Sequence, residues 1–423
     1  MNRLHPISLF MLLPVLLPTL AGCSEAECAT PDYTRAECRV LAENDFARLR
    51  TSDGAELRFR DPATDTTLAP ADDDGLWTAA GLIRERGGTV EVRVAHPGDF
   101  LLSLEAPADR AVTIDLSLSN VHPQAELFLG PTGSEQPVDA NGPGTRRRVD
   151  VILDPGERAF IRGHLPCEDE YRILVLADVQ TNPTQFARIL DRMQQEQADA
   201  EAVGQTLAGV LMAGDLTESS TEDEFRIFAD LLEPVRVPFA LTAGNHDIYE
   251  SILPYYNQNF GPGNYGFNVC DTRVAMLDTG SGAIASSVLG QLPTLFDRQG
   301  ADFLVTAMHH PPYAALTSAG WSEEDLAMIT LGEFAYQGGD LVIAGHAHML
   351  RDFLEVPVAD TILREMIVGT AGAWQGAGPP LYGYVRLTFE PQADAIWACF
   401  VEVPPPGAPK SDSTRTTLPF CQD

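Results

Sequence analysis

Basic residues are scarce in this chain of 423 residues. It contains 28 lysines and arginines against 60 aspartates and glutamates, which gives a formal net charge of −32. A surface this acidic lacks the cations that displace counterions from nucleic-acid phosphates, so nucleic-acid binding is not expected. We ascribe the acidity itself to solubility or to a saline habitat, and it indicates nothing about the substrate.

Long apolar runs are also nearly absent. The one candidate covers residues 7–20, but Pro14 and Pro18 interrupt it, and a membrane-spanning helix needs about 20 apolar residues. It leads into Leu20-Ala21-Gly22-Cys23, which resembles a bacterial lipobox and predicts a signal peptide over residues 1–22, cleaved before a lipidated Cys23. The alternative is an ordinary signal peptide followed by a chance cysteine. We therefore expect export to the bacterial cell envelope (periplasm or outer membrane), with a lipid anchor as the only membrane attachment.

No Cys-x-x-Cys pair occurs among the seven cysteines, which argues against a thiolate zinc site. Without Cys23 the count is even, and an exported chain with an even number of cysteines is expected to form disulfides. Many pairings are open. Cys28 and Cys38 are the nearest pair in sequence, and a bond between Cys399 and Cys421 would hold the tail.

The length of the chain predicts more than one domain after the signal peptide. Residues 23–75 are polar, and we interpret them as a tether with a small disulfide-linked cap. Residues 76–166 contain short strands separated by turn residues, with alternation at Val92, Val94, Leu102 and Leu104, which is typical of an antiparallel β-sandwich. This module carries no catalytic constellation, and its ligand cannot be named from its fold class.

Strands and helices alternate over residues 167–403, which predicts a layered α/β domain. The expected helices are Thr184–Gln197, Glu222–Leu232 with a cap at Ser220 or Thr221, a helix around Ser286–Phe296, and Glu323–Tyr336. Residues 404–423 are rich in proline, serine and threonine, and we expect an extended tail.

Five short polar motifs in this α/β region each follow an apolar strand. They are Asp178-Val179-Gln180, Gly214-Asp215, Gly244-Asn245-His246-Asp247, Met308-His309-His310-Pro311 and Gly345-His346-Ala347-His348. Five of the nine histidines belong to these motifs. Single motifs such as Gly-Asp are common in turns. Because α/β sheets gather ligands at the carboxyl ends of their strands, the whole set predicts a metal centre.

In their order and composition these motifs resemble the calcineurin-like metallophosphoesterase family, over about residues 170–402. The resemblance implies a four-layer αββα sandwich and two divalent metal ions (Mn, Fe, Zn or Mg). It implies that Asp178, Gln180, Asp215 and His348 hold the first metal. It implies that Asn245, His309 and His346 hold the second metal together with Asp215, which bridges the two metals.

The same resemblance implies a metal-dependent phosphoesterase, a phosphatase or phosphodiesterase, in which a hydroxide shared by the metals attacks phosphorus. His246 would protonate the leaving oxygen, and Asp247 would orient His246. His310 and Tyr313, together with Tyr249 and Trp374, are candidates to line the substrate cleft, but packing roles explain them equally well. Monoester, diester, nucleotide and phospholipid substrates all stay open.

Two positions separate this chain from common members of the family. The first motif usually ends in histidine, and Gln180 stands there instead, so a weak or inactive metal-binding lipoprotein is the first alternative. Purple acid phosphatases carry a tyrosine three residues after the Gly-Asp aspartate, where this chain has Glu218. This difference argues against the second alternative, an enzyme of the purple acid type.

Overall fold

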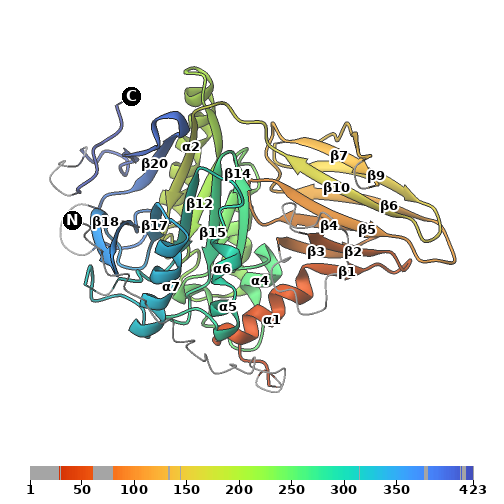
Figure 1. Cartoon of the computed structure of the whole chain (residues 1–423), viewed down its shortest axis with the longest axis horizontal. Coiled ribbons are helices and arrows are strands. Elements are labelled where there is room, and N and C mark those ends of the chain that lie inside the picture. Colours follow the sequence, from red (N-terminus) through yellow and green to blue (C-terminus); the bar gives the residue numbers. More distant parts are fainter. Residues whose placement is uncertain are drawn as a thin grey trace, which may run out of the picture.

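The computed structural model describes residues 28, 30–60, 80–131, 134–142, 144–313, 315–375, 380–409, 411 and 416–422. It has a C-terminal α/β part preceded by β sheets, as the sequence predicts, and the two parts lie side by side (Figure 1). Cys23 and the predicted signal peptide lie outside the described residues. No helix within the described ranges is long and apolar enough to cross a membrane.

The N-terminal part contains two sheets that share one apolar core. The six-stranded sheet has the order β1 (Arg48–Arg50), β2 (Glu56–Arg60), β5 (Phe100–Glu105), β10 (Arg158–His164), β7 (Glu126–Gly130) and β8 (Gln136–Pro137). The four-stranded sheet has the order β3 (Gly81–Arg86), β4 (Thr89–Val94), β6 (Val112–Ser119) and β9 (Arg147–Leu153). Side chains of β9 alternate between buried and exposed along its whole length, as expected for a strand with one face on the core.

Two features of this part differ from the sequence prediction. The pair β4 and β6 is parallel, whereas the other strand pairs described in the two sheets are antiparallel. Part of the segment interpreted as a tether and cap instead forms helix α1 (Ala36–Phe46) and the strands β1 and β2. Helix α1 was not predicted from the sequence. Its buried face carries the charged side chains of Arg39 and Glu43 together with small residues, so apolar residues do not recur at the spacing of a helix.

Two mixed sheets form the α/β part. The five-stranded sheet has the order β13 (Phe239–Thr242), β12 (Thr206–Ala213), β11 (Tyr171–Leu176), β20 (Gly383–Glu390) and β21 (Ala395–Glu402). The six-stranded sheet has the order β14 (Tyr265–Val269), β15 (Thr272–Leu277), β16 (Phe303–Met308), β17 (Leu341–Ala344), β19 (Thr361–Val368) and β18 (Leu350–Val358). Strands β11, β12 and β13 run parallel, and so do β15, β16, β17 and β19.

Helices cover the outer faces of these sheets, while the inner faces share one apolar core. The helices are α2 (Pro183–Glu201), α3 (Glu222–Leu232), α4 (Tyr255–Phe260), α5 (Ser286–Leu289), α6 (Leu292–Leu295) and α7 (Glu324–Tyr336), with the short 3-10 helices η3 (Asn245–Asp247) and η4 (Pro391–Ala393). The predicted helix around residues 286–296 is split into α5 and α6. Thr221 caps α3 in a capping box with Glu224.

Three disulfides join the six cysteines that follow Cys23. Cys28–Cys38 and Cys399–Cys421 are the two pairs suggested by the sequence, and Cys167–Cys270 is the third. Cys399–Cys421 and the backbone pairing of Phe400 with Phe420 hold the tail against β21. The bond between Cys167 and Cys270 joins the residues just before β11 to the turn between β14 and β15, and therefore links the two sheets.

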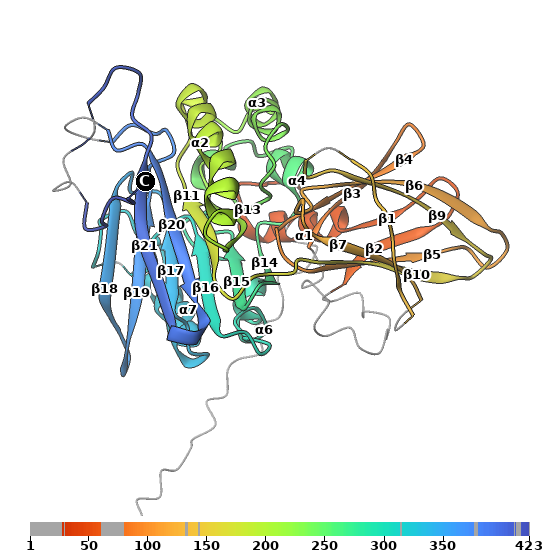
Figure 2. The ribbon, with the colours of Figure 1, turned by 90° about the horizontal axis from the view of Figure 1, so that it is seen from above.

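Helix α1 lies at the junction of the two parts (Figure 2), and a buried ion pair fixes it there. The guanidinium of Arg39 donates to both oxygens of Asp278, at 2.7 and 2.8 Å, and both side chains are 1% exposed. Asp278 directly follows β15. One turn further along α1, Glu43 accepts from the backbone N–H of Gly263 at 2.7 Å.

Removal of the Arg39 guanidinium should destabilise the protein more than removal of a similar surface arginine. In Arg39→Met the Asp278 carboxylate would stay buried without its cation, which costs about 3–5 kcal/mol. The matched control is Arg84→Met, because Arg84 lies 2.7 Å from Glu91 but these side chains are 42% and 34% exposed. The loss of unfolding free energy in Arg84→Met should be about 1 kcal/mol or less. We expect a clearly larger fall in the thermal unfolding midpoint for Arg39→Met, and equal falls would contradict the structure.

A second buried carboxylate makes stability depend on pH. Burial raises the pKa of Glu365 on β19 to about 8, and the backbone N–H of Tyr313 offsets this only in part. The folded state therefore retains a proton that the unfolded chain loses at a lower pH. This contribution is fully present below the ordinary glutamate pKa of about 4.3 and is lost as the pH rises through the folded value.

Glu365→Gln should remove this dependence, because the amide is neutral at every pH. The unfolding midpoints of wild type and variant should diverge from pH 5 to pH 8, with the variant gaining relative to wild type by up to roughly 4 kcal/mol at alkaline pH. Parallel midpoint curves over that range would show that Glu365 does not titrate as its burial predicts.

Candidate metal centre

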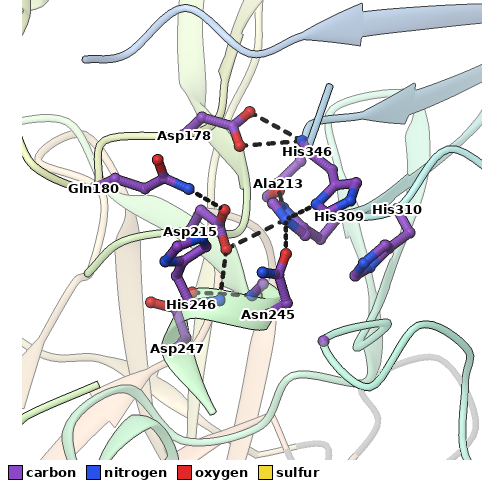
Figure 3. A network of polar contacts seen from close by, with 12 residues as sticks. Asp178, Gln180, Ala213, Asp215, Asn245, His246, Asp247, His309, His310 and His346 are labelled. Atoms are coloured by element: carbon purple, nitrogen blue, oxygen red, sulfur yellow. Dashed lines mark hydrogen bonds and ion pairs between the residues drawn. The ribbon is translucent and has the colours of Figure 1, made fainter. Parts of the chain in front are cut away.

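The five polar motifs meet at one edge of the α/β part, although they come from both of its sheets. Asp178 and Gln180 follow β11, Asp215 follows β12, and Asn245 opens η3 after β13. His309 and His346 follow β16 and β17 of the other sheet. Side chains of Asp178, Asp215, His309 and His346 point toward one another (Figure 3). The site thus forms where the carboxyl ends of parallel strands from two packed sheets come together.

The backbone at these positions is in an uncommon conformation. Five of the seven predicted metal ligands have a positive φ, namely Asp178 (66°), Gln180 (42°), Asp215 (56°), His346 (64°) and His348 (45°). Non-glycine residues in this region cost on the order of 1–3 kcal/mol each and cluster at functional sites. Gly244 permits the close packing, because a Cβ atom on it would lie 2.2 Å from Oδ1 of Asp215. The loops are therefore held in strained conformations that direct polar atoms inward.

Short distances join the candidate ligands of the second metal. Nε2 of His309 lies 3.2 Å from Oδ1 of Asp215, 3.1 Å from Oδ1 of Asn245 and 3.2 Å from Nδ1 of His346. Asp178, Asp215 and His309 form one group of potential ligand atoms, all within 4.8 Å of one another. Imidazole nitrogens and carboxylate oxygens are the donors that zinc, iron and manganese accept.

Two histidines have a fixed tautomer that suits metal binding. Nδ1 of His309 donates to the carbonyl oxygen of Ala213 at 2.8 Å, and Nδ1 of His348 donates to that of Trp374 at 2.8 Å. A carbonyl can only accept, so Nδ1 carries the proton, and Nε2 of each ring is left to face the site. Nε2 of His348 lies 3.5 Å from Oδ1 of Asp178. The residues present therefore fit a pair of divalent cations.

Gln180 is oriented differently from a ligand in the structure. Its amide nitrogen donates to Oδ2 of Asp215 at 2.6 Å. Ligation of a metal requires the amide oxygen, which a half-turn of the side-chain amide would bring to the same place. Gln180 therefore lies at the predicted position, and its role as a ligand stays a prediction.

The buried carboxylates of the site also favour a positive charge beside them. Burial raises the pKa of Asp178 well above its ordinary value, with His309 opposing the shift. Burial lowers the pKa of His309, but Asp215 outweighs it and raises that pKa to about 9. Burial lowers the pKa of His346 to about 4. A proton on His309 thus balances the carboxylates, and a bound cation would take its place.

Asp247 and His246 contact partners other than those expected. The Asp247 carboxylate accepts from the backbone N–H groups of Gly244, Leu216 and Thr217 at 2.9–3.1 Å. His246 instead places Nδ1 2.7 Å from the carbonyl oxygen of Glu218. Our expectation that Asp247 orients His246 is therefore not met. The short 3-10 helix turns the carboxylate back onto its own loop and the neighbouring one.

The candidate cleft residues have separate positions. His310 is buried with its ring centroid 4.0 Å from that of His346, and its ring belongs to a second potential ligand group with His309 and His346. Tyr313 packs against the outer core beside α7. Tyr249 is 53% exposed and its hydroxyl accepts from the Asn245 amide at 3.3 Å. Trp374 is 75% exposed.

Sequence reasoning missed two groups that position the site. The Glu218 carbonyl that holds His246 is a backbone atom, so no residue type could have revealed it. The hydroxyl of Thr279 accepts from the backbone N–H groups of both His309 and His310, at 3.0 and 2.9 Å. Its only signal is its position directly after Asp278 at the end of β15, in line with the other motifs.

Comparison with known proteins gives one family match. Residues 171–350 match the family described as calcineurin-like phosphoesterase. A protein named probable cyclic nucleotide phosphodiesterase, from Ruthia magnifica subsp. Calyptogena magnifica, is 23% identical over 153 residues, or 35% of this chain and 65% of that protein. The match thus spans just under two thirds of that relative.

Solved structures resemble the chain only in outline. A purple acid phosphatase from yellow lupin (Lupinus luteus) seeds gives a TM-score of 0.43 at 14% identity, covering 74% of this chain and 79% of that one. GAP50, the anchor in the inner membrane complex of Plasmodium, gives a TM-score of 0.42 at 17% identity, covering 56% of this chain and 85% of that one.

The Asp247→Asn variant should weaken metal binding although Asp247 is no ligand. An asparagine would turn its NH₂ group toward backbone N–H donors, so the loops that carry Asp215 and Asn245 would shift. We expect a 10–100-fold loss of Mn²⁺ affinity, as for other residues that support metal ligands, together with a lower thermal midpoint. The control is Asp223→Asn on α3, whose side chain is 84% exposed. Unchanged Mn²⁺ affinity in Asp247→Asn by calorimetric titration would contradict this role.

Proposed function

Because residues 171–350 belong to the calcineurin-like metallophosphoesterase family, we propose that this chain is a metal-dependent phosphoesterase that hydrolyses a phosphate mono- or diester. The observation that carries the proposal is the convergence of Asp178, Asp215 and His309, all buried, with Nε2 of His309 facing the carboxylate of Asp215 because Nδ1 is bound to the Ala213 carbonyl. A bound cation would compensate buried carboxylates gathered in this way.

Two divalent cations would be held by the residues that the family resemblance assigns. Asp178, Gln180 and His348 would hold one and Asn245, His309 and His346 the other, with Asp215 between them. When bound, the cations would supply the Lewis acidity that activates water and neutralises charge on the phosphoryl oxygens. The backbone N–H groups of His246 and His346, which donate to Asp215 and Asp178, keep both carboxylates turned into the site.

His246 is the proposed proton donor. Its Nδ1 atom is fixed by the Glu218 carbonyl at 2.7 Å, so a proton on Nε2 is the one available to the leaving oxygen. The Glu218 carboxylate lies 3.7 Å from the same Nδ1 atom. Positioned proton transfer of this kind contributes about 10²–10⁴-fold to the rate.

A metal-binding lipoprotein without turnover is the second candidate. The observation that favours it is the Gln180 amide, whose nitrogen faces Asp215 in place of a ligating imidazole. Export, lipidation of Cys23 and the domain boundaries at 76–166 and 167–403 are further proposals that rest on the sequence. The name of the bacterial relative makes a phosphodiester the first substrate to test.

The test is hydrolysis of 4-nitrophenyl phosphate and bis(4-nitrophenyl) phosphate by purified protein, stripped of metal and then given Mn²⁺. We expect Mn²⁺-dependent turnover, and the preferred ester identifies the substrate class. With an alkyl phosphate, whose alkoxide must be protonated as it leaves, His246→Ala should lower kcat by about 10²–10⁴-fold with Mn²⁺ still bound, because only proton transfer is lost. The two 4-nitrophenyl esters should lose less, because 4-nitrophenolate leaves without a proton. Asn245→Ala should weaken Mn²⁺ binding as well as turnover.

A matched histidine control is available in the β part. His164 on β10 is exposed and pairs with Asp99, far in sequence from the motifs, so His164→Ala should retain wild-type turnover. Stoichiometric Mn²⁺ binding without hydrolysis of either ester would reject the enzyme in favour of the binding protein.

A further inference from the structure

A pocket of about 340 Å³ lies beside the candidate metal centre, between the start of α2 and the face of α3. We call it the side pocket. The residues that line it include Gln180, Leu216, Thr217, Ile227, Phe228 and Leu231. The loops after β11 and β12, which carry Asp178 and Asp215, supply one wall, and α3 supplies the opposite wall.

The side pocket shares residues with the metal centre. Gln180 lines the pocket, and its amide donates to Oδ2 of Asp215 at 2.6 Å. Glu218 also lines it, and its carbonyl holds His246 at 2.7 Å. A phosphoryl group at the centre would therefore lie next to the side pocket, with Gln180 and Glu218 at the boundary between them.

The lining excludes a second anion. None of the residues that line the side pocket is lysine, arginine or histidine, while Glu218 and Glu224 are both carboxylates. Oε2 of Glu224 accepts from the backbone N–H groups of Ser219 and Thr221, which hold this carboxylate against its own loop. The remaining surface is mostly aliphatic and aromatic. Pockets of this kind bind uncharged apolar groups and use a few polar groups for orientation.

We propose that the side pocket binds an apolar hydrocarbon group of the phosphate ester, so that the physiological substrate carries an alkyl or aryl group and not a second phosphate. This proposal rests on the proposed function, because it places the phosphoryl group at the metal centre. Ile227 is the specificity-determining residue at the pocket mouth, since it is 44% exposed whereas Phe225 and Phe228 of the same helix are buried in the core.

The experiment compares the affinities of methylphosphonate and hexylphosphonate for the purified Mn²⁺-loaded full chain by calorimetry. Both probes carry the same anion, so a difference in Kd reports the alkyl chain alone. Burial of the additional methylene groups should make hexylphosphonate at least about tenfold tighter. Ile227→Asp should reduce the ratio of the two Kd values to near one.

The control variant is Ile329→Asp on α7, which covers the other sheet, because Ile329 is 54% exposed and does not line the side pocket. It should keep the wild-type ratio. Equal affinities of both phosphonates in the wild type, a ratio that survives Ile227→Asp, or no binding of either probe would each overturn the proposal.

Hydrolysis measured on the same samples separates this proposal from the proposed function. The substrates are methyl and hexyl 4-nitrophenyl phosphate, which release the same leaving group. A chain-length preference in phosphonate binding without hydrolysis of any ester would support the side pocket and reject the enzyme. Hydrolysis of both esters with equal kcat/KM and equal phosphonate affinities would support the enzyme and reject the side pocket.

Discussion

Electrostatic repulsion among buried carboxylates is the constraint on which the α/β part depends. Asp178 and Asp215 end neighbouring parallel strands and are fully buried, and Asp247 lies beside them. Each carboxylate is stabilised by backbone N–H groups, but these dipoles do not neutralise the charge. Among the histidines around them, His309 has its pKa raised, and burial lowers those of His346 and His348. The negative charge of these carboxylates is therefore not fully balanced by the protein, and bound metal cations would neutralise it.

The rest of the domain keeps this unfavourable arrangement in place. Strained backbone at five candidate ligands persists only where the surrounding structure fixes it. Two packed sheets with apolar inner faces provide a rigid base, and the disulfide between Cys167 and Cys270 joins them at the end of the strands remote from the motifs. Behind the site, Asn264 and Arg39 hold Asp278, and the adjacent Thr279 holds the backbone of His309. The N-terminal helix is therefore part of the support for the centre.

The sequence predicted the parts of this structure that depend on local signals. Helix α3 was predicted with its observed bounds because Thr221 and Glu224 form a capping box before an amphipathic run. The five polar motifs could be located because side-chain type and position after a strand are both local, and their role as metal ligands stays a prediction. Helix α1 was missed because Arg39 and Glu43 are buried by partners more than 200 residues away in the sequence. Likewise, the Glu218 carbonyl became visible as the partner of His246 only once the loops were placed.

Gln180 shows how one departure from the family pattern can serve two neighbouring sites. An imidazole has two ring nitrogens, and in the neutral ring only one accepts, so a histidine ligand must use its lone pair on the metal. A glutamine amide offers a carbonyl oxygen and an NH₂ group on a longer and more flexible side chain. In the structure the NH₂ group is bound to Asp215, and the same side chain lines the side pocket. The amide oxygen could still ligate the first cation, as carbonyl oxygens do for hard cations. The uncharged amide would also leave the adjoining pocket wall neutral, which is the property that an apolar ester group requires.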